Sequence, residues 1–179
     1  MNPWHDLPVG SNPPENVTAV IEIPRGSRNK YELDKTTGQI RLDRVLFSAV
    51  HYPGDYGLIP RTLHEDGDPL DILVSINEPT FPGCQIDCRP LGVLKMLDRG
   101  EPDDKIIAVP AQDPFYDDVF DIADLSQHYL KEVQHFFHIY KDLEGRRVEI
   151  LGWEKSDVAM QVVRESVERY EEKYLRLGP

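Results

Sequence analysis

The chain has 179 residues, of which 40% are hydrophobic, and no linker divides it, so we expect one domain spanning residues 1–179 with a single core. Its formal net charge of -12 argues against nucleic acid or an anionic membrane as a partner, because such surfaces are bound mainly by clustered lysine and arginine. Residues 1–16 lack the basic start and apolar segment of a secretory signal, and no hydrophobic run could span a bilayer. We therefore expect a cytoplasmic protein.

The first two thirds of the chain predict short strands broken by glycine and proline. An irregular arm at residues 1–16 precedes a strand at 17–23, and strands at 30–33 and 39–42 flank a hairpin turn. Residues 52–57 predict a turn-rich connector. Further strands are expected at residues 72–76, 85–97, 105–109 and 147–153. This pattern suits a closed antiparallel barrel built from about residues 17–110 and 147–153.

Two main helices are predicted in the C-terminal third. The first covers residues 125–144 and ends at Gly145 as its C-cap. Its apolar positions recur at intervals of three and four: Leu130, Val133, Phe137, Tyr140 and Leu143. The second covers residues 157–175, with Ser156 as its N-cap. Its expected buried stripe is Ala159, Val163, Val167, Tyr170 and Tyr174. The predicted fold class is thus α+β, mainly β.

Four carboxylates crowd into residues 65–71: Glu65, Asp66, Asp68 and Asp71. Two ionised carboxylates about 4 Å apart repel by about 4 kcal/mol at an effective dielectric constant of about 20, so a cation among them would relieve the crowding. Gly67 and Pro69 allow a bend that brings Asp71 back toward Asp66. Oxygen ligands suit Mg²⁺ or Mn²⁺ better than Zn²⁺. The alternative is a solvated acidic turn, which composition alone favours.

Several ordered segments resemble the soluble family I inorganic pyrophosphatases. Residues 66–72 match the signature of that family over their whole length. Other matching segments are residues 20–24, 29–32, 42–44, 52–57, 95–98 with Asp103 and Lys105, 135–137 and 140–143. They occur in the family's order and spacing, from about residue 8 to residue 153. So many ordered polar positions make the resemblance specific.

The resemblance implies a five-stranded OB-like closed barrel with peripheral helices, and hydrolysis of inorganic pyrophosphate to two orthophosphates by a metal-activated water attacking in line. It implies Mg²⁺ as cofactor, with Mn²⁺ or another divalent ion as a substitute. The implied metal ligands are Asp66, Asp71, Asp98 and Asp103, and the implied general base is Asp68. The implied substrate-binding residues are Lys30, Arg44, Tyr56, Lys105, Tyr140 and Lys141. Glu22, Glu32 and Tyr52 would have outer-sphere or supporting roles.

The resemblance also implies a homo-oligomer, commonly a hexamer in bacterial-type members, and residues 135–137 could supply packing surface for it. Two other functions stay open. One is a noncatalytic binding module, because OB-like barrels often bind nucleic acids or oligosaccharides. The other is a hydrolase for nucleotides or organic phosphates, which would share the metal ions.

Several residues remain without an assigned role. Asp104, beside Asp103, leaves the choice of ligand open by one position. His128, His135 and His138 are expected to serve packing rather than zinc binding. Arg25 and Arg28 are expected to be solvent-facing charges, and Arg99 is unexplained. The five aspartates at residues 113, 117, 118, 121 and 124 predict a solvated loop.

Overall fold

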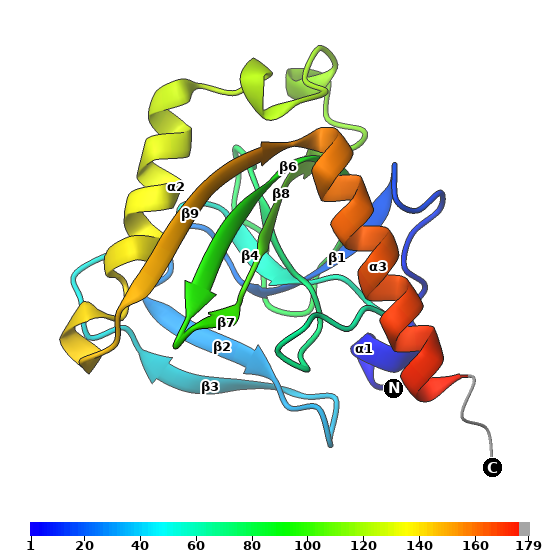
Figure 1. Ribbon diagram of the computed structural model, residues 1–179, viewed down its shortest axis with the longest axis horizontal. Helices are drawn as coiled ribbons and strands as arrows, with labels where there is room; N and C mark the ends of the chain where they lie inside the picture. Colours follow the sequence, from blue (N-terminus) through cyan, green and yellow to red (C-terminus); the bar gives the residue numbers. More distant parts are fainter. Residues whose placement is uncertain (176–179) are drawn as a thin grey trace.

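A closed ring of five strands forms the centre of the computed structural model, which describes residues 1–175 (Figure 1). The ring strands are β1 (Val17–Ile23), β4 (Asp55–Leu58), β5 (Asp71–Val74), β8 (Lys105–Pro110) and β6 (Gln85–Asp98). The long β6 closes the ring by pairing with β1, where Val17 lies opposite Cys88. All ring pairings are antiparallel except the parallel pair β5–β8. The predicted mainly-β fold with a closed five-stranded barrel is confirmed, but the expectation that the barrel is antiparallel is wrong for the pair β5–β8.

Strand β4 corrects the sequence prediction, which made residues 52–57 a connector. Its backbone pairs with β1, where Gly57 lies opposite Ile21. A Cβ atom at Gly57 would stand only 1.9 Å from the carbonyl oxygen of Val20. Glycine therefore marks a close approach of two strands here rather than a turn.

The remaining strands lie outside the ring. Within the described residues, strand β9 (Val148–Lys155) pairs with β6 alone, so residues 147–153, predicted as part of the barrel, lie outside the ring. The two-residue β7 (Glu101–Pro102) pairs with the end of β6. Strands β2 (Asn29–Leu33) and β3 (Ile40–Val45) form the predicted hairpin as a separate sheet. The hairpin lies across one end of the ring, at the bottom of Figure 1. This position lets the hairpin form one wall of a cavity.

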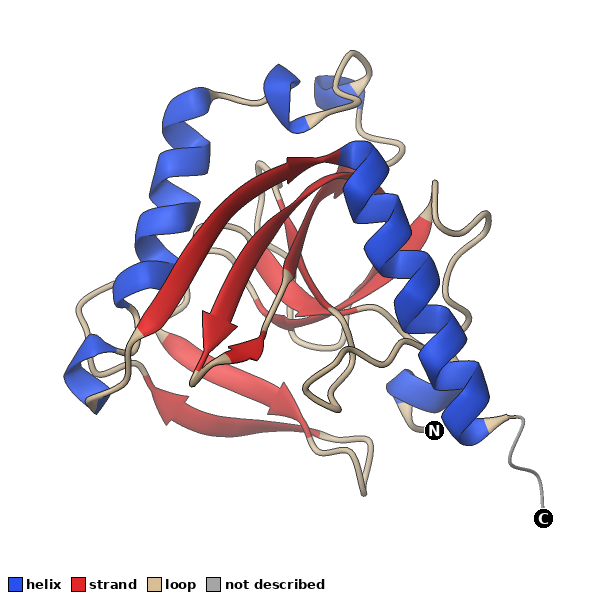
Figure 2. Ribbon diagram, in the orientation of Figure 1, coloured by secondary structure: helices blue, strands red, loops and turns tan. Residues whose placement is uncertain are grey.

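Two long helices flank the strands on opposite sides (Figure 2). Helix α2 (Gln127–Ile139) begins after Ser126, whose hydroxyl accepts a hydrogen bond from the Tyr129 N–H. The 3-10 turn η3 (Asp142–Glu144) follows and ends at Gly145, which has a φ of 73°. The predicted helix at 125–144 is therefore a shorter helix followed by a tighter turn, and Gly145 is the C-cap of that turn.

Helix α3 (Ser156–Tyr174) starts one residue earlier than predicted. The prediction of Ser156 as its N-cap is wrong, because Lys155 holds that position and makes no side-chain cap. The Ser156 hydroxyl instead donates a 3.0 Å hydrogen bond to Asp121. Of the predicted stripe, Ala159, Val163 and Tyr170 are buried, Val167 is partly buried and Tyr174 is 39% exposed. Val162 and Ser166 are also buried, which makes the contact face broader than predicted.

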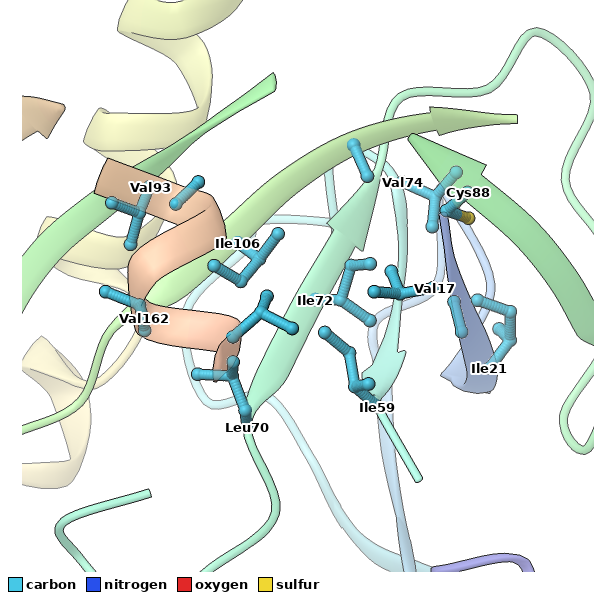
Figure 3. Packing of buried hydrophobic residues seen from close by; sticks show 14 residues of the cluster. Val17, Ile21, Ile59, Leu70, Ile72, Val74, Cys88, Val93, Ile106 and Val162 are labelled. Atoms are coloured by element: carbon cyan, nitrogen blue, oxygen red, sulfur yellow. The ribbon is translucent and has the colours of Figure 1, made fainter. Parts of the chain in front are cut away.

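Each long helix covers its own part of the core. Figure 3 shows Val162 of α3 beside Val93 and Ile106 of the ring strands. On the other side, Phe136 and Phe137 of α2 are only 4% and 1% exposed. The prediction that residues 135–137 supply packing surface for another subunit is therefore wrong for the two phenylalanines, which pack inside this chain.

The ends and loops are more ordered than expected. Residues Pro3–Asp6 form the short helix α1, in the region predicted to be an irregular arm, and the Trp4 indole donates a 2.8 Å hydrogen bond to Thr62. The 3-10 turns η1 (Pro114–Tyr116) and η2 (Ile122–Asp124) lie in the aspartate-rich loop. Asp113 and Asp121 accept backbone hydrogen bonds as N-caps there, so not all five aspartates are merely solvated. Among the residues described, no helix has the length and apolar character to cross a membrane.

Candidate active site

A cavity of about 610 Å³ lies between the β2–β3 hairpin and the ring. Its lining includes all the predicted site residues except Arg44 and Tyr52. Those that line it are Glu22, Lys30, Glu32, Tyr56, Asp66, Asp68, Asp71, Asp98, Asp103, Lys105, Tyr140 and Lys141. Segments far apart in the sequence thus contribute side chains to one hollow.

The acidic segment reaches the cavity through a tight turn before β5. Gly67 has a φ of 88°, and the Asp66 carboxylate accepts a 3.0 Å hydrogen bond from the Asp68 N–H. Behind the turn, the buried Thr62 hydroxyl accepts a 2.9 Å bond from the Leu70 N–H. The bend predicted from Gly67 and Pro69 therefore exists and presents Asp66, Asp68 and Asp71 to the cavity.

Lys105 is the most buried cation of the site, with 2% exposure. Its ammonium donates 2.5 Å hydrogen bonds to both Asp71 and Asp103. Burial opposes its charge, but the carboxylates of Asp103 and Asp71 hold the pKa of Lys105 well above its usual value. The buried ammonium is therefore charged and fixed between two acids.

The pKa values of Asp71 and Asp103, the two acids that contact Lys105, are shifted in opposite directions. Burial raises the pKa of Asp71, and Lys105 only partly offsets that effect. Burial also disfavours ionisation of Asp103, yet attraction to Lys105 and Lys141 lowers its pKa below the usual value. Asp103 is thus the better compensated of the two.

The structure separates Asp103 from Asp104. Asp104 does not line the cavity and is 3% exposed. Its carboxylate accepts a 2.5 Å hydrogen bond from Lys95 and lies 3.7 Å from the Nε2 atom of His64. The choice of Asp103 as the residue facing the cavity agrees with this arrangement, while Asp104 belongs to a neighbouring buried cluster.

Asp98 and Lys141 form an ion pair on another wall. The Lys141 ammonium donates a 2.6 Å hydrogen bond to one oxygen of Asp98. The other oxygen, Oδ1, is buried and has no protein partner among the described residues. Burial opposes the charge of Lys141, but Tyr140 and Asp98 raise its pKa. The unpaired Asp98 oxygen is a free ligand position in an otherwise satisfied pair.

The two predicted residues that do not line the cavity lie next to it. Arg44 on β3 pairs with Asp43 and, at 2.8 Å, with Glu144. Tyr52 is buried in the core, where its ring centroid lies 5.3 Å from that of Tyr56 and 4.7 Å from that of Phe136. Tyr52 can therefore support Tyr56 by packing, whereas Arg44 links the hairpin to η3.

The sequence prediction missed several residues that line the cavity. The most notable is Lys35 in the hairpin turn, whose ammonium contacts the Asp68 carboxylate. Arg41 and Arg146 also line the cavity. The turn itself was predicted, but only the folded hairpin shows that its tip reaches Asp68.

Glu22 is buried on β1 at 8% exposure. Burial raises its pKa to about 8, although a 2.6 Å hydrogen bond from the Leu33 N–H favours the charged form. Leu33 belongs to β2, so this bond ties the hairpin to the ring. Glu22 therefore links the hairpin to the ring, while burial disfavours the ionised form of its carboxyl group.

The donors of the cavity fit a hard divalent cation. Burial together with the carboxylates of Asp71 and Asp68 raises the pKa of Asp66. Burial is the largest cause of the raised pKa of Asp66 and Asp71, so a nearby cation would favour their ionised forms, and the buried Asp98 Oδ1 has no partner among the described residues. As they stand in the described residues, no three His, Cys, Asp or Glu side chains converge closely enough to hold an ion. The carboxylates of the cavity that would hold such ions are Asp66, Asp71, Asp98 and Asp103.

Comparison with known proteins identifies the family. The sequence model described as "Inorganic pyrophosphatase" matches residues 19–171. The chain belongs to the inorganic pyrophosphatase family. The inorganic pyrophosphatase of Haloferax volcanii is 49% identical over 175 residues, which cover 97% of this chain and 99% of that protein. That of Geobacillus stearothermophilus is 55% identical over 157 residues, covering 88% and 95%.

Solved structures agree with the family assignment. The crystal structure of the inorganic pyrophosphatase from Thermus thermophilus has a TM-score of 0.92 and 47% sequence identity, and covers 96% of this chain and 99% of that one. The resemblance to family I inorganic pyrophosphatases is thus confirmed, and the chain is an enzyme of the hydrolase class. Membership of this family implies dependence on divalent metal ions.

Proposed function

We propose that this enzyme hydrolyses inorganic pyrophosphate to two orthophosphates, with a metal-activated water attacking one phosphorus in line. The observation that carries the proposal is the cavity, because it combines carboxylates with the buried cations Lys105 and Lys141. Pyrophosphate carries negative charge on both of its phosphates. Both charges must be neutralised as the bond between phosphorus and the bridging oxygen breaks. The lysines of the cavity and bound metal ions together can supply the positive charge.

Asp66, Asp71, Asp98 and Asp103 are the residues that would hold the ions, for which we propose Mg²⁺, with Mn²⁺ able to replace it. When bound, such ions neutralise phosphate oxygens and lower the pKa of water from about 15.7 toward about 7. Glu22 and Glu32 line the same cavity and would accept hydrogen bonds from the waters around the ions.

We assign the proton acceptor to Asp68. Its side chain is 56% exposed and lines the cavity, so a carboxylate oxygen can reach an incoming water. The Asp66 carboxylate holds the Asp68 backbone, which limits how far the acceptor can move. The Lys35 ammonium contacts the same carboxylate from the tip of the hairpin.

Lysine and tyrosine side chains would bind the phosphate oxygens. Lys30, Lys105 and Lys141 are the proposed cations, and Arg44 would add its guanidinium from the hairpin. Burial holds the pKa of Tyr56 well above its usual value, so its hydroxyl keeps its proton and can donate. Burial likewise raises the pKa of Tyr140. The tyrosines therefore supply hydrogen bonds without adding negative charge.

The test is release of orthophosphate from pyrophosphate, ATP and an aryl phosphate, each with Mg²⁺ and with excess EDTA. We expect strong Mg²⁺-dependent release from pyrophosphate and little from the other two. Equal release from ATP would favour a broader nucleotide or organic phosphate hydrolase. Single-stranded nucleic-acid binding without hydrolysis would contradict the proposal.

We also propose that the enzyme assembles into a homohexamer and works in the cytoplasm, as bacterial-type members of the family do. Light scattering checks the assembly, and the molar mass of one chain would refute it. The buried positions of Phe136 and Phe137 mean that any contact between subunits must use other residues.

A further inference from the structure

His64 is buried next to the acidic turn, at 5% exposure, but it does not line the active-site cavity. Its backbone closes that turn. The His64 N–H donates a 2.7 Å hydrogen bond to the carbonyl oxygen of Asp68, and the His64 carbonyl accepts a 3.0 Å bond from the Gly67 N–H. The position of His64 is therefore tied to the positions of Asp66 and Asp68, which do line the cavity.

The imidazole of His64 joins this turn to the segment that precedes β8. The N–H of Asp104 donates a 3.4 Å hydrogen bond to Nε2 of His64, which also lies 3.7 Å from the Asp104 carboxylate. Asp104 directly follows Asp103, which lines the cavity. The ladder between β5 and β8 begins only at the pair of Asp71 and Lys105. His64 thus links the two segments just before the strands start to pair.

The segment that His64 contacts is itself fixed to the ring. Asp104 is 3% exposed, and its carboxylate accepts a 2.5 Å hydrogen bond from Lys95 of β6. The N–H of Asp103 donates a 2.9 Å hydrogen bond to the carbonyl oxygen of Met96 on the same strand. The imidazole therefore connects the acidic turn to a hydrogen-bonded part of the ring and not to a free loop.

The second ring nitrogen of His64 argues against a role in packing alone. Nδ1 is buried and has no hydrogen-bond partner among the described residues. A buried polar atom without a partner lowers the stability of a protein. A leucine would fill a similar space without this cost, so packing gives no reason for an imidazole at this position. The contact of Nε2 with Asp104 does give one.

We propose that His64 is a positioning residue, which holds the acidic turn against Asp104 so that Asp66 and Asp103 are placed to bind divalent ions. This inference rests on the proposed function, because it takes both aspartates as metal ligands. Groups that orient metal ligands without binding the ion typically contribute about tenfold to a hundredfold in metal affinity. His64 acts through the backbone of the turn and the backbone of Asp104.

Three variants of His64 separate the contact from the packing. His64→Leu removes both ring nitrogens. In His64→Asn the side-chain amide extends only about as far as Nδ1 did, whereas in His64→Gln it reaches the position of Nε2 and can accept the Asp104 N–H. The glutamine variant should therefore restore what the leucine and asparagine variants lose.

Isothermal titration calorimetry with Mn²⁺ measures the effect on the folded proteins, with circular dichroism as the check of folding. Binding should weaken by about tenfold to a hundredfold in His64→Leu and His64→Asn, and stay within about threefold of the original chain in His64→Gln. His128→Leu is the control for loss of one histidine, because the His128 side chain is 80% exposed on α2. This control should bind Mn²⁺ as the original chain does.

Amide hydrogen exchange, followed by NMR on the metal-free proteins, tests the contact without any metal. The Asp104 N–H should exchange slowly in the original chain and in His64→Gln. It should exchange faster in His64→Leu and His64→Asn, which leave this N–H without its acceptor.

The proposal is overturned if the Asp104 N–H exchanges equally in all four proteins, or if the asparagine and glutamine variants bind Mn²⁺ equally. Failure of the proposed function gives a different result. If the original chain itself binds no Mn²⁺, the assigned metal ligands are wrong and the role of His64 is refuted with them. Equal binding by the original chain and the His64 variants refutes the role of His64 alone.

Discussion

Replacing Glu22 by glutamine is a direct test of how the active-site cavity treats a buried acid. The folded-state pKa of Glu22 is about 8, compared with a usual value of 4.5, mainly because the side chain is buried. At about 1.4 kcal/mol per pKa unit, forcing this carboxyl to ionise costs up to about 5 kcal/mol of folding stability. Glutamine cannot ionise and can still accept the hydrogen bond from the Leu33 N–H.

The sign of the pH dependence follows from the direction of this shift. Because the folded-state pKa is raised, the contribution of the protonated acid is fully present below pH 4.5 and is lost as the pH rises through about 8. We therefore expect the metal-free parent protein to lose a few kcal/mol over this range through Glu22, whereas the glutamine variant keeps that part of its stability.

Urea unfolding of both metal-free proteins, from about pH 5 to about pH 9, measures the difference. The matched control is Glu32→Gln, in the same cavity but with a side chain that is 47% exposed, which should follow the parent. Parallel loss of stability in the parent and in the Glu22→Gln variant would show that Glu22 is not held protonated, and the reasoning from burial would fail.

Three further predictions concern the reaction itself. Asp68→Asn should lower kcat by about a hundredfold to ten-thousandfold at saturating Mg²⁺, as expected for loss of a general base, and unchanged turnover and pH profile would remove Asp68 from that role. Arg44→Lys should lower kcat/KM, because a lysine ammonium cannot both replace the planar guanidinium group on phosphate and keep the contact with Glu144. Equal kinetics of the two proteins would contradict this. Asp71→Asn should weaken Mn²⁺ binding, followed by isothermal titration calorimetry, more than Asp98→Asn does, because burial raises the pKa of Asp71 despite its contact with Lys105 and an added cation offsets that cost. The reverse order would refute that charge argument.

The strand and helix pattern was predicted well where a segment carries its own signal. The alternation in β1 and the turn residues of the β2–β3 hairpin are local features, and both elements formed as predicted. Strand β4 was missed because its Gly57 is explained only by the nearby Val20 backbone on another strand. The N-cap prediction for α3 failed for a similar reason, since the Ser156 hydroxyl donates to Asp121, which is 35 residues away. Distant partners of this kind leave no trace in local spacing.

The same limit applies to the site. Family resemblance named the residues that line the cavity, and the acidic run indicated that a cation is needed there. Neither the resemblance nor the acidic run could indicate that the ammonium of Lys105 lies between Asp71 and Asp103, or that Lys35 reaches Asp68. Both contacts depend on how the strands of the ring and the hairpin are arranged in space.

The distribution of charge in the cavity indicates where positive charge is still required. Asp103 lies close to Lys105 and Lys141, and its pKa is lowered despite burial. Asp66 and Asp71 have raised pKa values because burial and neighbouring carboxylates outweigh the Asp68 N–H hydrogen bond at Asp66 and the Lys105 ammonium at Asp71. We therefore expect a divalent cation to bind at Asp66 and Asp71, because its charge would offset the burial and repulsion that disfavour their ionised forms. For the proposed reaction we therefore expect metal binding to precede productive binding of the anionic substrate.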